Sequence, residues 1–378
     1  METLFGVPQG QFQVSRFPLR KNELLQAWDA ADEYLLNYLA TDAHLNKNSS
    51  VCILNDGFGA LALALHAFRP VAISDSFLSQ QSTRQNFASN AIAVEQIQLL
   101  DSLTAPQVGI EYLLIKAPKT LALFEDQLYR LRPLLNADSR VVVAGMVKNM
   151  PASLWKLLET LIGPTTTSLA YKKARLIFAR PDVGLHLTET PYPTVYPLEN
   201  TGFKISNHAN VFSRDSLDIG ARFFLQHLPD NPGFRNVIDL GCGNGVLGLV
   251  LASQQREARL TFVDESYMAI ASAKENFLAA FDGQRQAEFV VGDCLSGFPD
   301  ATADCIMCNP PFHQQHAIGD HIAWQMFRQA YRVLRQGGEF RVIGNRHLHY
   351  HISLKKLFGN VTQVASNSKF VVYTSVRL

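Results

Sequence analysis

The chain has 378 residues, of which 47% are hydrophobic and 18% are charged. This length allows two domains that each bury a full core, and the composition is typical of a globular protein and excludes a disordered one. Residues 1–180 carry 17 Lys and Arg against 15 Asp and Glu, and the remainder carries 17 against 18. With a net charge of only +1, nucleic-acid contacts would have to come from local patches rather than from a basic tail.

The first residues, Met1 to Phe5, contain no basic segment followed by an apolar stretch, and no apolar run approaches the roughly 20 residues that span a bilayer. We therefore expect no signal peptide, no membrane span and a cytoplasmic location. The five cysteines are odd in number and scattered through apolar segments, which indicates reduced thiols rather than a disulfide framework.

In residues 1–180, apolar β-like runs alternate with helix-like stretches, which predicts an α/β fold with a mostly parallel sheet covered by helices. Near the end of this range Lys172, Lys173 and Arg175 form a basic patch, and a second patch follows later at 328–335. Each patch either contacts RNA or is an ordinary solvated face. Four prolines among polar residues then mark 181–202 as a partly extended linker, so we expect domains at 1–180 and 203–378.

After the linker, Phe212 and Arg214 precede an expected helix at 217–228. They could cover a cofactor or contact RNA, and a helix start capped by Ser213 fits equally well. The same alternation of elements continues to the end of the chain. We expect strands at Val237–Leu240, Leu260–Val263, Glu288–Val291, Asp304–Cys308, Glu339–Ile343 and Phe370–Ser375, and helices at Gly245–Ser253, Tyr267–Phe281 and Ala323–Leu334.

The first of these strands ends in an acid and a glycine-rich turn, 237–245, that opens a helix. Alternate glycines let the backbone bend tightly and approach a ligand. Gly243, Gly245 and Gly248 also match the dinucleotide fingerprint, so this piece alone leaves a nicotinamide cofactor open. Asp239 favours S-adenosylmethionine, because a carboxylate there can hold the methionine ammonium group and would repel a pyrophosphate.

The next two strands also end in acids. Asp264 and Glu265 are placed to accept the ribose hydroxyls, and Asp293, beside Cys294, could accept the adenine amino proton, although helix capping is the usual role of a single aspartate there. Ligands of such folds lie at the carboxyl ends of the strands. The candidate cofactor-binding residues are Asp239, Gly241, Cys242, Gly243, Asn244, Gly245, Asp264, Glu265, Asp293 and Cys294.

The strand at 304–308 ends in Asn309, Pro310, Pro311 and Phe312, the candidate catalytic residues. Two prolines fix the backbone, so the Asn309 side-chain oxygen and the Pro310 carbonyl become fixed acceptors. Two acceptors that hold both protons of an exocyclic amine favour attack by its nitrogen on a sulfonium methyl, while Phe312 stacks on the ring. Alignment and electrostatics replace a strong base.

Cys305 and Cys308 form a C-x-x-C within this strand. Strand alternation sends the two sulfurs to opposite faces, so they cannot share a metal ion or a disulfide. His313 and His316 follow at irregular spacing, and we expect a loop that contacts substrate or solvent, with His313 as a substrate candidate, and no metal site.

The two halves can be superposed as an internal repeat of a whole domain. The first copy lacks the acid, the first glycine and the asparagine of the second, which predicts a catalytically inactive copy that holds a large substrate or merely stabilises the other domain. The differences are Ile53 for Asp239, Asn55 for Gly241 and Lys116 for Asn309. The matched segments are 54–61 on 240–247, 73–76 on 262–265, 100–101 on 292–293, 114–119 on 307–312, and 173–178 on 369–373.

The glycine turn at 239–245 with the Asn309–His313 tract, behind a degenerate first copy, resembles the bacterial ribosomal RNA guanine-N2 methyltransferases of the C and G types. The stretch 208–228 and the near-full-length match resemble the G type most, which modifies 23S rRNA. The resemblance implies two tandem Rossmann-like class I methyltransferase domains with mixed, mostly parallel seven-stranded sheets that arose by duplication. It also implies S-adenosylmethionine as donor, S-adenosylhomocysteine as product, 23S rRNA as partner, and a monomer in which the first copy is an internal partner.

Three alternatives remain open. A glutamine side chain of a protein also presents an NH2 group, although such sites typically carry Tyr where this chain has Phe312. A nicotinamide oxidoreductase would bind NADH and not S-adenosylmethionine. A non-enzymatic RNA-binding assembly factor would not need an intact Asp239 and Asn309.

Overall fold

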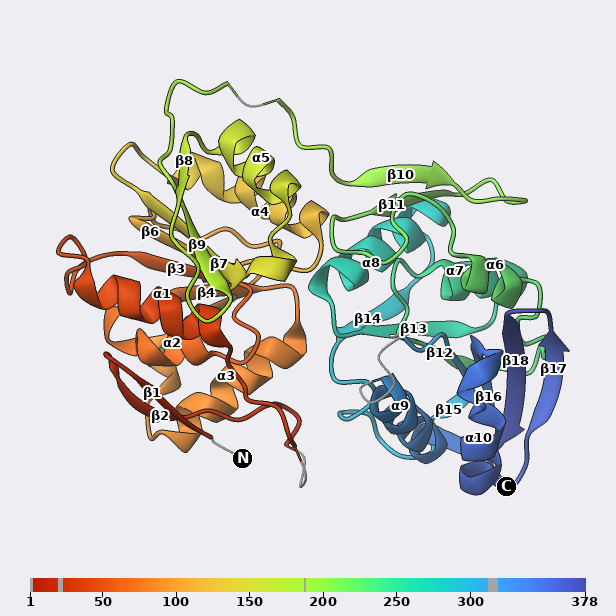
Figure 1. Ribbon diagram of the computed structural model, residues 1–378. Coiled ribbons are helices and arrows are strands. Elements are labelled where there is room, and N and C mark those ends of the chain that lie inside the picture. Colours follow the sequence, from red (N-terminus) through yellow and green to blue (C-terminus); the bar gives the residue numbers. More distant parts are fainter. Residues whose placement is uncertain (1–2, 20–22, 187, 312–318) are drawn as a thin grey trace. The chain divides into compact units, whose positions relative to one another are not determined.

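The computed structural model describes residues 3–19, 23–186, 188–311 and 319–378. The chain forms two compact units, Met1–Pro191 and Tyr192–Leu378. Each unit contains a seven-stranded, mostly parallel sheet with helices on both faces (Figure 1). Both predictions, the α/β class and the mostly parallel sheets, are confirmed.

The sheet of the N-terminal unit has the strand order β5-β4-β3-β6-β7-β9-β8, with β9 antiparallel to both of its neighbours. A two-stranded hairpin of β1 and β2 precedes it. The strands are β1 Leu4–Val7, β2 Gly10–Gln13, β3 Val51–Leu54, β4 Val71–Ser74, β5 Gln98–Asp101, β6 Tyr112–Lys116, β7 Arg140–Met146, β8 Thr165–Thr167 and β9 Ala174–Ala179. The helices are α1 Ala30–Thr41, α2 Ala60–Ala64, α3 Phe77–Ser89, α4 Leu121–Leu131 and α5 Ala152–Leu161.

The C-terminal unit repeats this plan, with a hairpin of β10 and β11 followed by the sheet order β14-β13-β12-β15-β16-β18-β17. The strands are β10 Thr194–Pro197, β11 Lys204–Asn207, β12 Asn236–Leu240, β13 Arg259–Asp264, β14 Ala287–Val291, β15 Ala303–Cys308, β16 Leu334–Asn345, β17 Thr362–Ser366 and β18 Phe370–Val376. The helices are α6 Ile219–Leu225, α7 Val246–Gln254, α8 Tyr267–Ala280, α9 Gly319–Val333 and α10 Tyr350–Phe358.

Each sheet separates two apolar cores. In the C-terminal unit one core contains side chains from α6, α7 and α8, and the other contains side chains from α9 and α10. Cys305 belongs to the first core and Cys308 to the second, so the prediction that the two sulfurs lie on opposite faces is confirmed. In the N-terminal unit α1, α2 and α3 cover one face, and α4 and α5 cover the other.

An amide clamp recurs in both units. In each, one asparagine on the helix after the second sheet strand accepts a backbone N–H, and donates to two carbonyls, over distances of 2.7 to 3.0 Å. The clamp thereby ties the end of the hairpin, or the residues just after it, to the turn after the first sheet strand. The clamps are Asn86 on Ser15 and Phe58, and Asn276 on Ser206 and Asn244.

Strand register corrects two of the expected superpositions. The partner of the last residue of β3 is Ile73, and the partner of the last residue of β12 is Val263, so these two correspond and 73–76 matches 263–266, one residue later than predicted. On the next strand Asp101 corresponds to Val291, so Asp293 has no aspartate counterpart. A match between two short apolar strands can be shifted by one or two residues, because neighbouring residues in such strands are chemically similar.

Three local predictions differ in detail from the structure. The expected linker, 181–202, is not all connecting chain, because its last part supplies β10, which pairs with β11. The helix expected at 217–228 extends only over α6. Its N-cap is Asp218, whose carboxylate accepts from the Ala221 N–H at 2.9 Å, whereas Ser213 has a positive φ of 55° and donates to the Ser216 carbonyl.

No helix in the described part of the chain combines the length and apolarity needed to cross a bilayer.

Candidate functional site

The glycine turn after β12 is shaped by positive φ values at Gly241 (70°), Gly243 (54°) and Gly245 (78°). A Cβ at Gly245 would lie 2.9 Å from the Ala273 methyl group, so this glycine permits close packing of the turn on α8. At Gly243 a Cβ would meet nothing within 4 Å. The turn therefore presents bare backbone to open space at Gly243, where a ligand can approach it.

Asp239 lies on the face of the sheet that α6, α7 and α8 cover, and its side chain is fully buried. Oδ2 accepts from the Gly248 N–H at 2.9 Å, and Oδ1 has no hydrogen-bond partner among the described residues. Burial, with a smaller contribution from Asp264, raises the pKa of Asp239 to about 7. A buried carboxyl without a cation is strained electrostatically, and a ligand ammonium group would relieve that strain.

Asp264 ends β13 and connects the second strand to the glycine turn. Its Oδ2 accepts from the Gly243 N–H at 2.9 Å and its Oδ1 from the Ser266 N–H at 3.0 Å. Glu265 follows directly and is half-buried. Both carboxylates therefore stand at the carboxyl end of β13, beside the turn, as predicted from the sequence.

Asp293 lies two residues beyond β14, and its Oδ1 accepts from Gln325 of α9 at 2.7 Å. Burial raises the pKa of Asp293, and burial together with the Asp293 charge raises the pKa of the Cys294 thiol to about 12. Cys294 has a positive φ of 48°. Gln325 was not predicted as a site residue, because only the fold brings α9 to this strand end.

Two candidate cofactor residues serve the scaffold through their side chains. Asn244 donates to the Tyr196 hydroxyl at 3.2 Å and to the Asn207 side-chain oxygen at 2.9 Å, and accepts from the Val246 N–H. Cys242 is buried and its Sγ lies 3.6 Å from the Gly243 carbonyl oxygen. Any contact from Asn244 to a ligand would therefore come from its backbone.

Asn309 follows β15 on the same face of the sheet as Asp239. Its side-chain Oδ1 is buried and has no hydrogen-bond partner among the described residues. Pro310 is buried and Pro311 is exposed. Phe312 and His313, predicted as catalytic and substrate residues, lie outside the described residues, as does His316.

A third buried acceptor was not predicted. Asn345 ends β16, the strand next to β15, and its Oδ1 also lacks a partner in the described part of the chain. Alternation from Ile343 places Asn345 on the same face as Asp239 and Asn309. Among the described residues, three unsatisfied acceptors thus lie at or next to the carboxyl ends of three neighbouring strands, β12, β15 and β16.

The candidate substrate residues are distributed over both units. Phe212 is 71% exposed, and Arg214 pairs with Asp215 at 3.4 Å and lies 6.0 Å from the Tyr192 ring centroid. Lys172 and Lys173 form a tight turn with positive φ values.

Within that turn, Lys172 pairs with Glu33 at 2.7 Å, and Lys173 is exposed. The guanidinium of Arg175 lies 5.9 Å from the Trp155 ring centroid. In the second basic patch, 328–335, Arg332 and Arg335 pair with Asp300 and Asp304, so that patch is largely structural.

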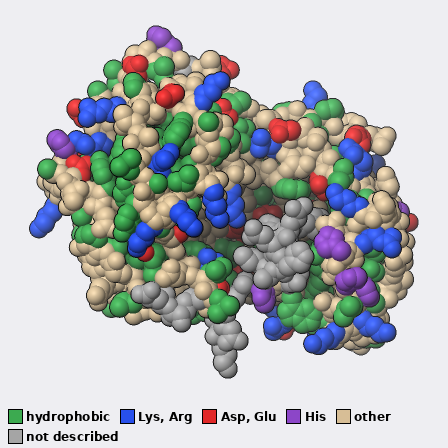
Figure 2. Space-filling model, in the orientation of Figure 1, with side chains coloured by type: hydrophobic (Ala, Val, Ile, Leu, Met, Phe, Trp, Pro, Cys, Tyr) green, Lys and Arg blue, Asp and Glu red, His purple; other side chains and the backbone are tan. Residues whose placement is uncertain are grey.

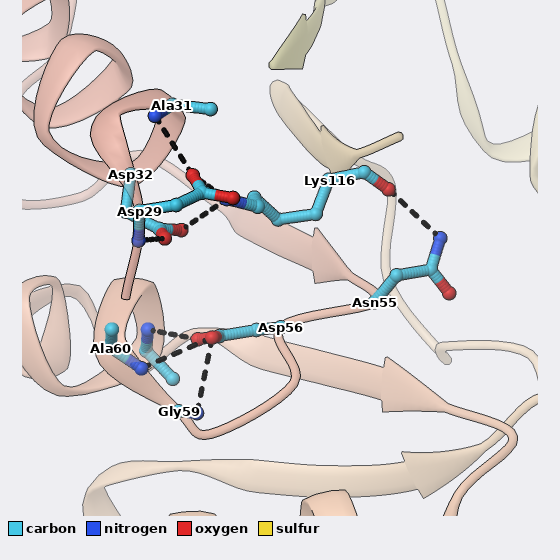
Figure 3. A network of polar contacts seen from close by, with 9 residues as sticks. Asp29, Ala31, Asp32, Asn55, Asp56, Gly59, Ala60 and Lys116 are labelled. Carbon is cyan, nitrogen blue, oxygen red and sulfur yellow. Dashed lines mark hydrogen bonds and ion pairs between the residues drawn. The ribbon is translucent and has the colours of Figure 1, made fainter. Parts of the chain in front are cut away.

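The N-terminal unit holds a different arrangement at the same place (Figure 3). The residue after the last β3–β6 pair is Lys116, and the residue after the last β12–β15 pair is Asn309, so the two positions are equivalent. Lys116 Nζ pairs with Asp29 at 2.7 Å and Asp32 at 2.9 Å. Both acids come from the start of α1, so the side chain at this position has its partners within the N-terminal unit.

In the N-terminal unit, Asp56 follows Asn55 in the turn between β3 and α2. It accepts from the N-terminal N–H groups of α2, as Asp239 accepts from an N–H group of α7. It accepts from the Gly59, Ala60 and Ala62 N–H groups at 2.9 to 3.0 Å (Figure 3). Burial raises the pKa of Asp56, and burial raises the pKa of Asp32 to about 6 despite the Lys116 charge. The first turn thus satisfies its acceptors internally.

The C-terminal residues fit S-adenosylmethionine. Asp239 offers a buried carboxyl oxygen for an ammonium group, and Gly243 leaves room at the backbone. Asp264 ends the next strand, and Asp293 lies two residues past the end of the one after it. Among the described residues, no cluster of three or more His, Cys, Asp or Glu side chains is arranged to hold a metal ion.

The chain is similar to known proteins along its whole length. The family model described as RLMG N-terminal domain matches residues 2–183, and the one described as Methyltransferase small domain matches 202–374. A ribosomal RNA large subunit methyltransferase G of Aeromonas salmonicida is 50% identical over 100% of both chains. One of Erwinia tasmaniensis is 50% identical over 96% of both.

Among solved structures, a T. thermophilus 16S rRNA N2 methyltransferase in complex with AdoMet and guanosine is similar, with a TM-score of 0.78 at 20% identity. The match covers 100% of this chain and 98% of that one. At this identity the likeness shows the fold alone, and it extends over both units.

Proposed function

Since the chain belongs to the ribosomal RNA large subunit methyltransferase G family, we propose that it transfers a methyl group from S-adenosylmethionine to the exocyclic N2 amine of one guanine in 23S rRNA. The relatives' name supports the large-subunit substrate, and the pair of unsatisfied acceptors at Asp239 and Asn309 supports amine chemistry. The carrying observation is Asn309: its buried Oδ1 has no partner in the described part of the chain.

S-Adenosylmethionine, when bound, supplies an electrophilic methyl group on a sulfonium sulfur. Asp239 would hold the ammonium group of the donor, and Gly243 leaves room for the donor beside the backbone. Asp264 and Glu265 would accept from the ribose hydroxyls, and Asp293, whose carboxylate Gln325 fixes, would accept from the adenine amino group.

At the acceptor base, the Asn309 side-chain oxygen and the Pro310 carbonyl accept from the two N2 protons of guanine. With both protons held, the nitrogen becomes more pyramidal, and its lone pair is less delocalised into the ring and more available to the methyl carbon, so positioning and electrostatics lower the barrier. The N–C bond would form as the methyl–sulfur bond breaks, S-adenosylhomocysteine would leave, and the methylated nitrogen would then release one proton to solvent. Pro311 fixes the backbone that carries these acceptors. Phe312 stacks on the base, and the base must come from a loop or be flipped out of a helix.

We further propose that the units arose by duplication and that domains 1–180 and 203–378 have separate tasks. The identical strand order and the repeated amide clamp support a common origin. The first domain is inactive and supplies RNA affinity through Lys172, Lys173 and Arg175, as an internal partner within a monomer. Phe212, Arg214 and His313 contact the RNA in the second domain, and the enzyme works in the cytoplasm, with its substrate.

The test is Asn309→Ala. Loss of one positioned acceptor lowers the methylation rate about 100-fold or more, because such contacts act mainly in the transition state. The measurement is incorporation of labelled methyl into 23S rRNA from cells that lack this protein, with mass spectrometry to identify N2-methylguanine. S-Adenosylmethionine affinity and the melting temperature stay at wild-type values.

Wild-type turnover by Asn309→Ala would remove Asn309 from catalysis. A product on protein glutamine, or on another base, would contradict the proposed substrate.

A further inference from the structure

The last part of the chain is strongly and uniformly basic. Residues 340–378 contain six Lys and Arg and no Asp or Glu, together with three histidines at 347, 349 and 351. The net charge of the whole chain is only +1, because acidic residues elsewhere balance the basic residues of this segment. A one-sided charge distribution indicates a surface that faces a polyanion.

Part of this charge gathers where β16 ends. The short helix Arg346–Leu348 follows β16 directly, and α10 begins at Tyr350. The turn between β17 and β18 joins the same place, since the Arg346 N–H donates to the Lys369 carbonyl at 2.9 Å. We call the side chains of Arg346, His347, His349 and Lys369 the β16 exit surface.

These four side chains are exposed, and none forms an ion pair with any residue that the structure describes. Arg346 donates to the Asn367 carbonyl at 3.1 Å, and Lys369 lies 5.2 Å from the Phe370 ring centroid, contacts that orient each cation without neutralising it. Figure 2 shows His, Lys and Arg side chains on the part of the unit where Figure 1 draws α10, the helix that begins directly after this surface and carries cations of its own. The surface is therefore cationic and open.

The surface also lies beside the reaction site. β15 and β16 are parallel neighbours, with Cys308 paired to Val342, so their carboxyl ends meet at one edge of the sheet. Neighbouring strands lie about 4.8 Å apart, and β16 continues three residues past that pair before the exit surface begins. A nucleotide at Asn309 would thus have its own backbone within reach of these cations.

We propose that the β16 exit surface binds RNA phosphates next to the target guanine. The inference rests on the proposed function and adds to it the residues that hold the RNA strand at the catalytic unit. Arg346 suits a bidentate contact to phosphate, Lys369 a point contact, and imidazole N–H groups of His347 and His349 can donate to phosphate oxygens. These contacts position the strand and carry no sequence information.

The experiment compares two double variants of the full chain, Arg346→Gln/Lys369→Gln and Lys355→Gln/Lys356→Gln. Both remove two charges from the same basic segment, but Lys355 and Lys356 lie on the last turn of α10, away from the strand end. Binding to a 23S rRNA transcript is measured in the presence of S-adenosylhomocysteine over a range of salt concentrations. S-Adenosylhomocysteine affinity and melting temperature report on folding, and Arg346→Lys tests whether charge alone restores binding.

The exit-surface variant should bind RNA about tenfold more weakly, and the slope of log affinity against log salt should fall by about 1.5, as expected for two lost phosphate contacts. The α10 variant should change neither quantity appreciably. Equal losses in the two variants, or wild-type affinity and slope in the first, would overturn the proposal. So would a loss of binding to phosphatidylglycerol vesicles with RNA binding unchanged. Because no methyl transfer is needed, a wild-type protein that bound this RNA without methylating it would contradict the proposed function and not this surface.

Discussion

The two units place opposite electrostatic arrangements at equivalent strand ends. In the N-terminal unit a lysine ends the fourth sheet strand, β6, and two acids at the start of α1 neutralise it. In the C-terminal unit an asparagine takes the lysine's position, and its oxygen, like that of Asp239, has no partner among the described residues. With the same strand order, the polar groups at this position are therefore paired with one another in one unit and left without partners in the other.

This difference separates what the fold requires from what binding requires. The sheet order, the amide clamp and the glycine at Gly59 or Gly245 are present in both units, so they belong to the architecture. The unpaired oxygens of Asp239 and Asn309 have no equivalent at the corresponding strand ends of the N-terminal unit, as far as the structure describes it. Because unpaired buried acceptors destabilise a fold, their retention indicates that a ligand completes them.

The largest effect on this comparison is expected from Lys116→Met. It leaves Asp29, Asp32 and the nearby Asp56 without their cation, which costs about 3 kcal/mol or more because uncompensated buried charges remain. Chemical denaturation of the full chain should show an earlier transition assigned to the N-terminal unit, with S-adenosylmethionine affinity unchanged until that transition. A variant as stable as the wild type would show that the ion pairs contribute nothing.

The same substitution has a predictable pH dependence. The folded-state pKa of Asp32 is raised to about 6, so below that pH the carboxyl is protonated and loses little when Lys116 is absent. Above pH 6 it is ionised and needs the lysine. The stability difference between Lys116→Met and the wild type should therefore grow from pH 5 to pH 8, as measured by denaturation at each pH.

A smaller effect is expected from Asp239→Asn. The amide can still accept from Gly248, but it no longer attracts an ammonium group, so S-adenosylmethionine should bind about tenfold to 100-fold more weakly. The unliganded variant should melt at or above the wild-type temperature at pH 8, because a buried ionised carboxylate has been removed. Lower stability together with unchanged affinity would assign Asp239 to the scaffold.

The smallest expected effect is the pH dependence of cofactor affinity in the wild type. The pKa of Asp239 in the unliganded protein is raised to about 7, and only the ionised form pairs with an ammonium group. Affinity should fall about tenfold per pH unit below pH 6, relative to its value between pH 7 and pH 8, and fall again at higher pH as the ligand ammonium group loses its proton. Calorimetric titration from pH 5 to pH 9 measures this, and Asp239→Asn, which has no group to titrate there, is the matched control.

Much of the C-terminal site could be predicted from the sequence because its chemistry is local. Asp239, the glycine turn and Asn309 with its prolines each occur within a few residues, and strand ends of one sheet gather at one edge. The strand at 304–308 and the division of its two cysteines between faces also follow from period-two alternation. Such features depend on neighbours in the chain.

Contacts between distant segments could not be predicted in this way. Lys116 contacts Asp29, which is 87 residues away in the sequence, and Asn276 contacts Ser206, which is 70 residues away. Gln325 reaches Asp293 only because α9 packs beside β14. The register slips in the superposed segments have a related cause, since neighbouring strand residues have interchangeable side chains and only hydrogen-bond pairing distinguishes them.

The Lys116 ion pairs also bear on how a chain with two like sheets assembles correctly. During synthesis, β6 and β15 could in principle insert beside each other's neighbours, because both are short apolar strands that end at the same depth. If β15 took the place of β6, the buried Asp32 and Asp56 would lose the lysine beside them, and Asn309 could not neutralise them. The lysine thus makes the exchange of β6 and β15 energetically unfavourable, which favours the pairing of each strand within its own sheet.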